Sequence, residues 1–163
     1  MSSEKFTFFY KGPLSQWSLS PFTVDEVEYN CAEQYMMAEK ARLFGDRETW
    51  EKILATDSPK KHQELGRQVL GFDEEIWEAH ARNIVYDGNW AKFSQSENHR
   101  NALMLTAGTT LVEASPVDQL WGIGLSEKDP RALNRSTWRG RNWLGEVLTI
   151  VRINLTRKLD LNA

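Results

Sequence analysis

Two charged residues, Glu33 and Lys40, fall within the apolar stripe of a helix that the sequence predicts over residues 31–44. At about 100° of rotation per residue, Lys40 points within about 20° of Glu33, and Met37 and Phe44 share this face. Burying a charge costs several kcal/mol unless the charge is paired or neutralised. Two explanations are open: Lys40 reaches solvent while Glu33 caps a neighbouring backbone group, or both side chains line a ligand pocket.

The pocket explanation implies a definite chemistry. A desolvated lysine has a lowered pKa and can act as an amine nucleophile, while a carboxylate can serve as an acid or a base. The two residues lie about 10.5 Å apart along the helix axis, which suits a ligand lying along the helix. The opposite face carries Tyr35, Glu39 and Arg42 and is expected to be polar. Cys31 lies on that side, so we do not expect a thiol nucleophile in this site.

A second candidate segment follows a strand predicted over residues 109–114. Asp118 offers a carboxylate, Trp121 offers a stacking face for a base, and Gly122 and Gly124 permit close backbone approach to a ligand. The alternative is a tight turn packed against the core, since a Gly-x-Gly beside a Trp is also typical of such turns.

A third candidate segment covers residues 138–145, where Asn142 is placed to cap the final helix. Free N–H groups and the positive end of the helix dipole favour a phosphate there, and Arg139 or Arg141 could add a bidentate contact. The alternative is an ordinary cap with two surface arginines.

Length and composition narrow the class of protein. The chain has 163 residues, of which 40% are hydrophobic and 26% charged, so we expect a single compact domain over residues 1–163. One Cys and three His without a metal-ligand spacing argue against a zinc site, so we expect no metal. The sequence contains no Walker loop, Rossmann fingerprint or Gly-x-Ser-x-Gly elbow, which leaves NTPase, dehydrogenase and serine hydrolase activities without support.

The formal net charge of −3 argues against a large phosphate-tracking surface for duplex nucleic acid, while it allows a small anionic ligand. A nucleic-acid substrate would still need a local basic patch, for which the candidates are Arg131, Arg135, Arg139 and Arg141. The sequence has no signal-peptide pattern and no apolar run long enough to cross a membrane. We therefore expect a cytoplasmic or nuclear protein without a membrane partner.

The elements that must position these residues are mostly helical. Short strands are expected over residues 6–10, 22–29 and 109–114. Helices are expected over residues 31–44, after Asp46, over residues 58–70, after Asp73, over residues 90–93 and 98–107, and at the end of the chain. Asp87-Gly88 is expected to bend or end the helix that begins after Asp73. The predicted fold class is α+β, mainly α, with a few short strands.

Four motifs, in this order, resemble those of one known family. They read AEQYMMAEKA at residues 32–41, VEASP at 112–116, WGIG at 121–124 and GRNWLG at 140–145. Together they closely resemble the NADAR, or YbiA-like, family, over nearly the whole chain from about Phe8 to about Leu155. One loop departs from the family pattern, because Leu14-Ser15-Gln16-Trp17 stands where the family commonly reads Phe-Ser-Asn-Phe.

The resemblance implies a small, mainly helical α+β domain with N-glycosidase activity and no cofactor. The implied catalytic residues are Glu33, Lys40 and Asp118. The resemblance further implies functional roles for Trp121 and Asn142. Beyond these two, we expect substrate binding by Ser15, Tyr35, Gly122, Gly124, Arg139 and Arg141. We expect a monomer that binds a nucleotide substrate through its ADP-ribose moiety, with single-stranded or modified nucleic acid as a candidate substrate.

The family includes two catalytic branches. One removes ADP-ribose from guanine bases and the other hydrolyses early riboflavin-pathway intermediates. The Trp-Gly-Ile-Gly-Leu form of the third motif resembles the ADP-ribose branch, which is therefore the leading hypothesis. A riboflavin-intermediate N-glycosidase is the second hypothesis, and a non-catalytic ADP-ribose-binding module is the third.

Overall fold

The computed structural model describes residues 3–163, which form two compact units. The central unit comprises residues 16–97, and the terminal unit comprises residues 3–15 and 98–163. Six α-helices and four short β-strands lie within residues 3–163, so the predicted α+β, mainly α class is confirmed.

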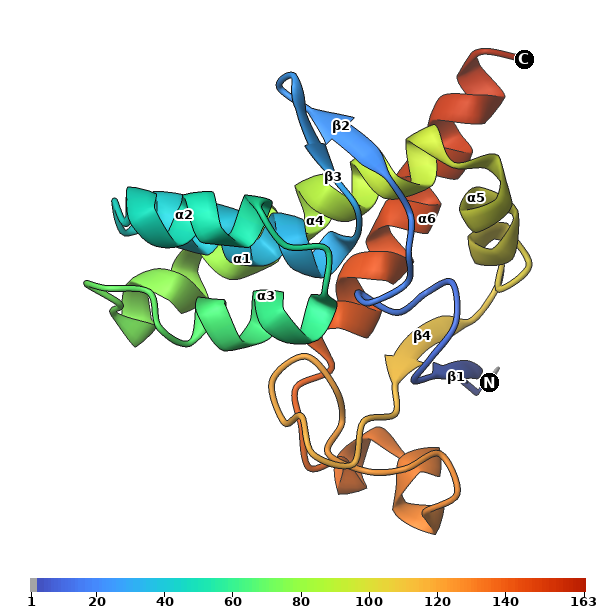
Figure 1. The fold of residues 1–163 in the computed structure, drawn as a ribbon. Helices are drawn as coiled ribbons and strands as arrows, with labels where there is room; N and C mark the ends of the chain where they lie inside the picture. The colour runs from blue at the N-terminus through green and yellow to red at the C-terminus, as the bar shows by residue number, and fades with distance from the viewer. Residues whose placement is uncertain (1–2) are drawn as a thin grey trace. The chain divides into compact units, whose positions relative to one another are not determined.

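The central unit is a group of four helices with one β-hairpin (Figure 1). Its elements are β2 (Phe22–Val24), β3 (Val27–Tyr29), α1 (Ala32–Leu43), α2 (Arg47–Leu54), α3 (Pro59–Gly66) and α4 (Glu74–Gln95). Helix α1 packs against α2, α3 and α4. It is therefore surrounded by helices, which explains why so few of its side chains reach solvent.

Three helices of the central unit begin at the residues that the sequence predicts. The side chain of Asp46 accepts a hydrogen bond from the Thr49 N–H, and the side chain of Asp73 accepts one from the Ile76 N–H. Ser58 caps α3 in the same way. Each cap satisfies an N–H that would otherwise have no partner at a helix start.

Helix α3 ends earlier than the prediction of a helix to Leu70. It stops at Gly66, and the chain then turns through Gly71, which has a φ of 77°. The Leu70 N–H donates to the Asp46 carboxylate at 2.9 Å instead of to a helical carbonyl. The carboxylate of Asp46, the N-cap residue of α2, thus takes the place of a helical carbonyl as the acceptor for the Leu70 N–H.

The expected break at Asp87-Gly88 is wrong, because α4 runs without interruption from Glu74 to Gln95. Gly88 is needed for packing. A Cβ added at Gly88 would lie 2.5 Å from Cδ1 of Tyr35 on α1, so only glycine lets the two helices approach this closely.

Replacing Gly88 with alanine is therefore expected to destabilise the protein. Overpacking costs about 1–3 kcal/mol, and a 2.5 Å approach to the buried Tyr35 ring places the cost in the upper part of this range, about 2–3 kcal/mol. The better helix propensity of alanine offsets about 1 kcal/mol, so we expect a net loss of about 1–2 kcal/mol in the free energy of unfolding. Urea unfolding measures this loss. The matched control is Asn83→Ala on the exposed face of α4, which should be neutral or slightly stabilising. A Gly88→Ala protein as stable as the wild type would contradict the packing argument.

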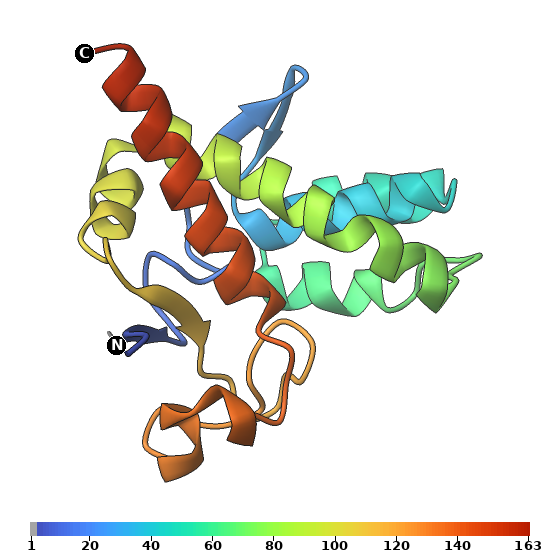
Figure 2. The same cartoon turned by 180° about the vertical axis from the view of Figure 1, so that it is seen from behind.

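The terminal unit contains a parallel strand pair covered by one long helix (Figure 2). Strand β1 (Phe6–Phe9) pairs in parallel with β4 (Thr110–Glu113), and α6 (Trp143–Leu161) packs on β4. Helix α5 (Glu97–Met104) precedes β4, and two 3₁₀ turns, η1 (Pro130–Leu133) and η2 (Arg135–Thr137), lie in the long connection to α6. The terminal unit has a small core of Val112, Ile123, Leu125 and Ala132, and Phe6, Phe8 and Trp138 pack against it.

Candidate active site

Glu33 and Lys40 both lie on α1 and are both withdrawn from bulk solvent. Glu33 is 4% exposed, and its N–H donates to the Gln16 carbonyl at 2.9 Å. Lys40 is half-buried, with its Nζ 4.6 Å from the ring centroid of Phe72 and 5.5 Å from that of Trp77. The lysine ammonium therefore lies against aromatic faces.

The surroundings of Lys40 favour its neutral amine. Burial lowers the pKa of Lys40, the nearby Glu33 carboxylate opposes this with a smaller effect, and the Arg67 charge lowers the pKa further. A lysine with a lowered pKa holds more of its population as the free amine, which is the nucleophilic form.

The polar face expected on α1 does not exist in the first half of the helix. Every residue from 32 to 38 is buried. Tyr35, expected on the polar side, is 5% exposed and lies with its ring centroid 5.0 Å from that of Tyr29 and 6.0 Å from that of Phe22. Tyr35 therefore packs the hairpin onto the helix, and its predicted contact with substrate stays a prediction.

Cys31 lies at the N-cap of α1 and is 1% exposed, so the expected polar location of this residue is also wrong. Burial raises the pKa of the thiol to about 11, which keeps it protonated at neutral pH. The thiol is thus unsuited to be a nucleophile because it is buried.

A second lysine with a lowered pKa, Lys92 on α4, is one that the sequence patterns did not single out. It is fully buried and lies with Nζ 4.8 Å from the ring centroid of Phe93, and burial lowers its pKa to about 7. Lys40 keeps some exposed surface and Lys92 has none, so Lys40 is the better candidate nucleophile of the two.

In the terminal unit, Asp118 organises the turn that carries Trp121. One of its carboxylate oxygens, Oδ1, accepts hydrogen bonds from the N–H groups of Leu120 (2.9 Å) and Trp121 (2.8 Å). The Ser115 hydroxyl accepts the Asp118 N–H at 3.1 Å. Oδ1 is thus occupied by the turn itself.

The two glycines of this segment serve the backbone of the turn. A Cβ at Gly122 would lie 2.9 Å from the Glu113 carbonyl oxygen and 3.1 Å from that of Asp118, and Gly124 has a φ of 69°. These contacts favour the tight-turn explanation for both residues. Their contact with a ligand stays a prediction.

Asn142 occupies the N-cap position of α6, but its side chain makes no capping hydrogen bond, so that part of the prediction is wrong. The side chain instead bridges β4: its amide donates to the Leu111 carbonyl at 3.0 Å, and its oxygen accepts the Glu113 N–H at 2.9 Å. Asn142 has no exposed surface and a left-handed backbone, with a φ of 54°. Its visible role is to hold the start of α6 against β4.

The N–H groups expected to bind an anion at the start of α6 are partly occupied. The Trp143 N–H donates to the Leu120 carbonyl and the Leu144 N–H to the Trp121 carbonyl, both at 3.1 Å. The expected set of free donors is therefore reduced. The ring of Trp121 meets that of Trp143 edge to face at 5.7 Å, and the guanidinium of Arg141 lies 5.5 Å from the Trp143 ring centroid. Trp143 thus lies together with Trp121 and Arg141, although the motif at residues 140–145 did not indicate a role for it.

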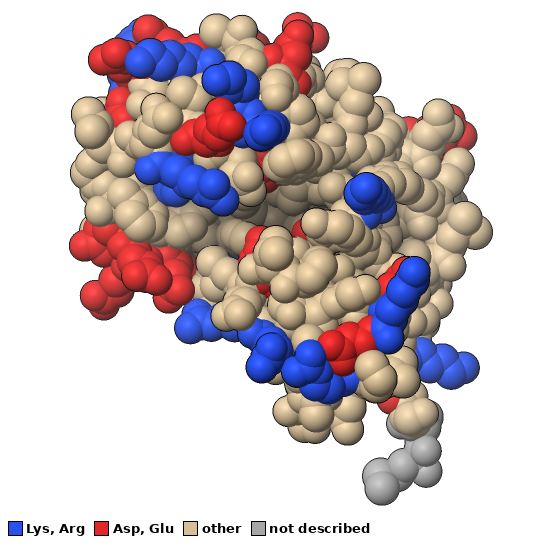
Figure 3. Space-filling model, turned by 60° about the horizontal axis from the view of Figure 1, so that its bottom comes forward, with Lys and Arg blue, Asp and Glu red and all other residues tan. Residues whose placement is uncertain are grey.

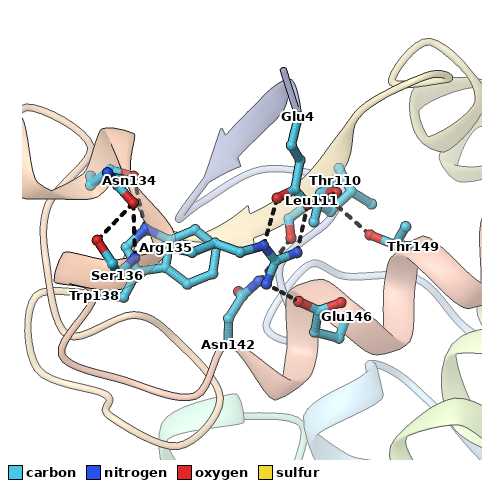
Figure 4. A network of polar contacts seen from close by, with 11 residues as sticks. Glu4, Thr110, Leu111, Asn134, Arg135, Ser136, Trp138, Asn142, Glu146 and Thr149 are labelled. Carbon is cyan, nitrogen blue, oxygen red and sulfur yellow. Dashed lines mark hydrogen bonds and ion pairs between the residues drawn. The ribbon is translucent and has the colours of Figure 1, made fainter. Parts of the chain in front are cut away.

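Two of the four arginines proposed as a basic patch are neutralised. Arg135 makes a bidentate ion pair with Glu4, at 2.6 Å for both nitrogens, and a third contact with Glu146 at 2.8 Å (Figure 4). Arg131 pairs with Asp129 at 2.7 Å. Arginines saturated by carboxylates are poor phosphate ligands.

Arg139 and Arg141 are both exposed. On the face drawn in Figure 3, basic and acidic side chains alternate over largely uncharged surface. Such a surface suits a small anionic group better than a long nucleic-acid duplex. Ser15, the remaining expected binding residue, is partly buried in the terminal unit, where its N–H donates to the Gly12 carbonyl at 3.0 Å.

Glu113, at the end of β4, is a titratable residue that the sequence analysis did not assign to the site. Burial raises the pKa of its carboxyl to about 8, and the charge of Asp118 adds to this shift. One signal in the sequence could have revealed it: an acidic residue ends an apolar strand, a few positions before a second carboxylate. Two carboxyl groups in unlike surroundings are typical of acid–base pairs.

Residues 3–163 contain no group of three or more His, Cys, Asp or Glu side chains arranged to hold a metal ion. Within the same residues, no helix is both long and apolar enough to span a membrane.

Comparison with known proteins identifies relatives over most of the chain. The family model for the NADAR domain matches residues 7–156. Protein irg-1 of Caenorhabditis elegans is 44% identical over 139 residues, which make up 84% of this chain and 66% of that protein. N-glycosidase R617 of Acanthamoeba polyphaga mimivirus is 39% identical over 165 residues, covering 93% of this chain and 97% of that protein.

Two further comparisons concern a larger plant protein and a solved structure. The chloroplastic riboflavin biosynthesis protein PYRR of Zea mays is 33% identical over 121 residues, which cover 72% of this chain but 18% of that protein. The NMR structure of the E. coli protein YbiA aligns with a TM-score of 0.78 and 26% identity, covering 97% of this chain and 89% of that one. The YbiA-like fold expected from the motifs is thereby confirmed.

Proposed function

The chain belongs to the NADAR domain family, and from this premise we propose that it is an N-glycosidase, a hydrolase that cleaves the bond between a ribose carbon and a base-like nitrogen. The observation that carries the proposal is the 39% identity to N-glycosidase R617, which extends over nearly the full length of both chains. The half-buried amine of Lys40 and the buried carboxylate of Glu33 are consistent with this chemistry.

Glycosidic C–N cleavage passes through a state with positive charge on the sugar. It needs a negative group near the ribose, a proton for the leaving nitrogen, and a nucleophile. We assign Asp118 to stabilise the charge or to bind the ribose hydroxyls, and Glu33 as the acid or base. Lys40 either attacks the anomeric carbon as a free amine or holds a phosphate electrostatically.

The remaining assignments concern binding. We propose that Trp121 stacks on the base and that the exposed Arg139 and Arg141 hold the phosphate groups. Asn142 is assigned to position the start of α6, since its side chain is occupied by β4. That all these residues act on one substrate stays a prediction.

We propose ADP-ribosylated guanine in nucleic acid as the substrate, because the third motif resembles that of the ADP-ribose branch. The kinship to PYRR favours an early riboflavin-pathway intermediate as the second candidate. In both substrates a ribose that carries phosphate is joined to a base-like nitrogen.

The pure protein should therefore release ADP-ribose from an ADP-ribosylated guanine oligonucleotide and regenerate the unmodified strand. Mass spectrometry of both products measures this result, and the matched second arm uses the ribosylamino-pyrimidine intermediate. Cleavage of the pyrimidine alone would favour the riboflavin branch. Binding of ADP-ribose by calorimetry, without turnover of either substrate, would replace the enzyme with a binding module.

A further inference from the structure

The backbone of Glu113 is held in place on both sides. Its N–H donates to the Asn142 side chain at 2.9 Å, and its carbonyl accepts the Ile123 N–H at 2.9 Å. Oε2 of its carboxyl is buried and has no hydrogen-bond partner among the residues that the structure describes. Buried polar atoms are usually hydrogen-bonded, so an unsatisfied one on a fixed backbone requires an explanation.

The turn after β4 brings Asp118 close to Glu113. The Gly124 N–H donates to the Asp118 carbonyl at 3.0 Å, while the neighbouring Ile123 N–H serves Glu113. Gly122 touches both carbonyl groups, since a Cβ there would lie 2.9 Å from one and 3.1 Å from the other. One short glycine-rich segment therefore holds the backbones of the two acidic residues close together, and the charge of Asp118 acts on the Glu113 carboxyl.

Asp118 is the charged group that acts on Glu113. Strand β1 carries no charged residue, and Glu146 on α6 is paired with Arg135. The guanidinium of Arg152 on α6 donates to the backbone carbonyls of Thr106 at 2.9 Å and of Thr109 at 2.5 Å. Burial, supplemented by the Asp118 charge, raises the pKa of Glu113 to about 8, so this carboxyl keeps its proton at neutral pH. A protonated carboxyl with a second acidic side chain near it is the arrangement of a general acid and a charge-stabilising group.

We propose that Glu113 donates the proton to the leaving nitrogen, with Asp118 as the partner that stabilises the sugar cation. This inference rests on the proposed N-glycosidase function and goes further by naming the acid, which leaves Glu33 to act as the base. The unsatisfied Oε2 is then the atom that meets the substrate nitrogen.

The step balances in atoms and electrons. The Glu113 proton moves to the leaving nitrogen as the C1′–N bond breaks, and the electron pair of that bond goes to the nitrogen. Over the whole reaction one water adds its hydroxyl to C1′, directly or by hydrolysing a Lys40 imine. The remaining proton of that water restores the Glu113 carboxyl.

The test is the pH dependence of kcat/KM for wild type, Glu113→Gln and Asp118→Asn. Wild-type kcat/KM should fall as pH rises through about 8, because the acid then loses its proton. Glu113→Gln should lower activity by about 10²-fold and remove this alkaline fall. Asp118→Asn should move the fall to lower pH, because the charge that helps to raise the Glu113 pKa is gone. The matched control is Glu127→Gln, an exposed acid of the same unit, which should behave as wild type.

Stability provides a readout that does not depend on turnover. The folded-state pKa of Glu113 lies above its ordinary value of 4.5, so its contribution to stability is complete below that pH and is lost as pH rises through about 8. Wild type should therefore lose stability relative to Glu113→Gln between these two pH values. This difference also shows that Glu113→Gln is folded.

Glu113→Gln activity within about threefold of wild type, with the alkaline fall retained, would overturn the assignment while the N-glycosidase function stands. If the wild type cleaves neither substrate, the proposed function fails and the acid role fails with it. A stability difference that does not change with pH would show that Glu113 carries no proton at neutral pH, and would also overturn the assignment.

Discussion

Borohydride added during turnover is expected to trap a ribose-derived adduct on Lys40. In this mechanism the free amine attacks the anomeric carbon, ring opening forms an imine, and reduction makes the bond permanent. The half-buried setting of Lys40 over Phe72 and Trp77, with its lowered pKa, favours the amine form that such an attack needs. Peptide mapping by mass spectrometry locates the adduct.

Lys40→Arg is expected to abolish turnover, because arginine keeps the positive charge but cannot lose a proton to become a nucleophile. The matched control is Lys60→Arg at the exposed surface of α3, which should keep full activity. Substantial activity of Lys40→Arg, or spectra without an adduct under trapping conditions, would leave Lys40 an electrostatic role. Water activated by Glu33 would then be the nucleophile.

Glu33→Gln is expected to lower kcat by about 10²-fold or more, with ligand binding largely retained. Glutamine keeps the shape of the side chain and much of its hydrogen bonding, and it removes proton transfer and charge. Because Glu33 is 4% exposed at the start of α1, bulk water has little access to take over the role of the lost carboxylate. Steady-state kinetics and calorimetric binding of ADP-ribose separate the two effects.

The matched control for Glu33 is Glu39→Gln on the same helix, where the carboxylate pairs with Arg42 at 3.3 Å near the surface. It should leave kcat unchanged, because surface ion pairs contribute little. Turnover of Glu33→Gln within about threefold of wild type would make Glu33 a structural residue and move the base elsewhere.

The sequence alone determined the features that depend on near neighbours along the chain. Asp46, Ser58 and Asp73 begin helices where expected, because each cap bonds an N–H three residues ahead. The placement of Glu33 and Lys40 on one face of α1 also followed from helical periodicity, which repeats every 3.6 residues in any α-helix. Periodicity left open whether Lys40 reaches solvent, and the structure shows it half-buried.

Tertiary structure decided the features that depend on residues far apart in the sequence. Gly88 lies inside the uninterrupted α4, where the absence of a Cβ leaves room for the ring of Tyr35 on α1. Asn142 forms hydrogen bonds with β4 instead of capping its own helix. Arg135 is neutralised by Glu4, which lies 131 positions away. No local pattern encodes such partners.

The protonation of Glu113 is also a tertiary property. The strand pattern and the later aspartate were visible in the sequence, but the pKa depends on how much water is removed and on how close a charge lies. Desolvation and Coulomb energy vary with distances in space, and these distances are set only when the Gly122 turn folds back on β4.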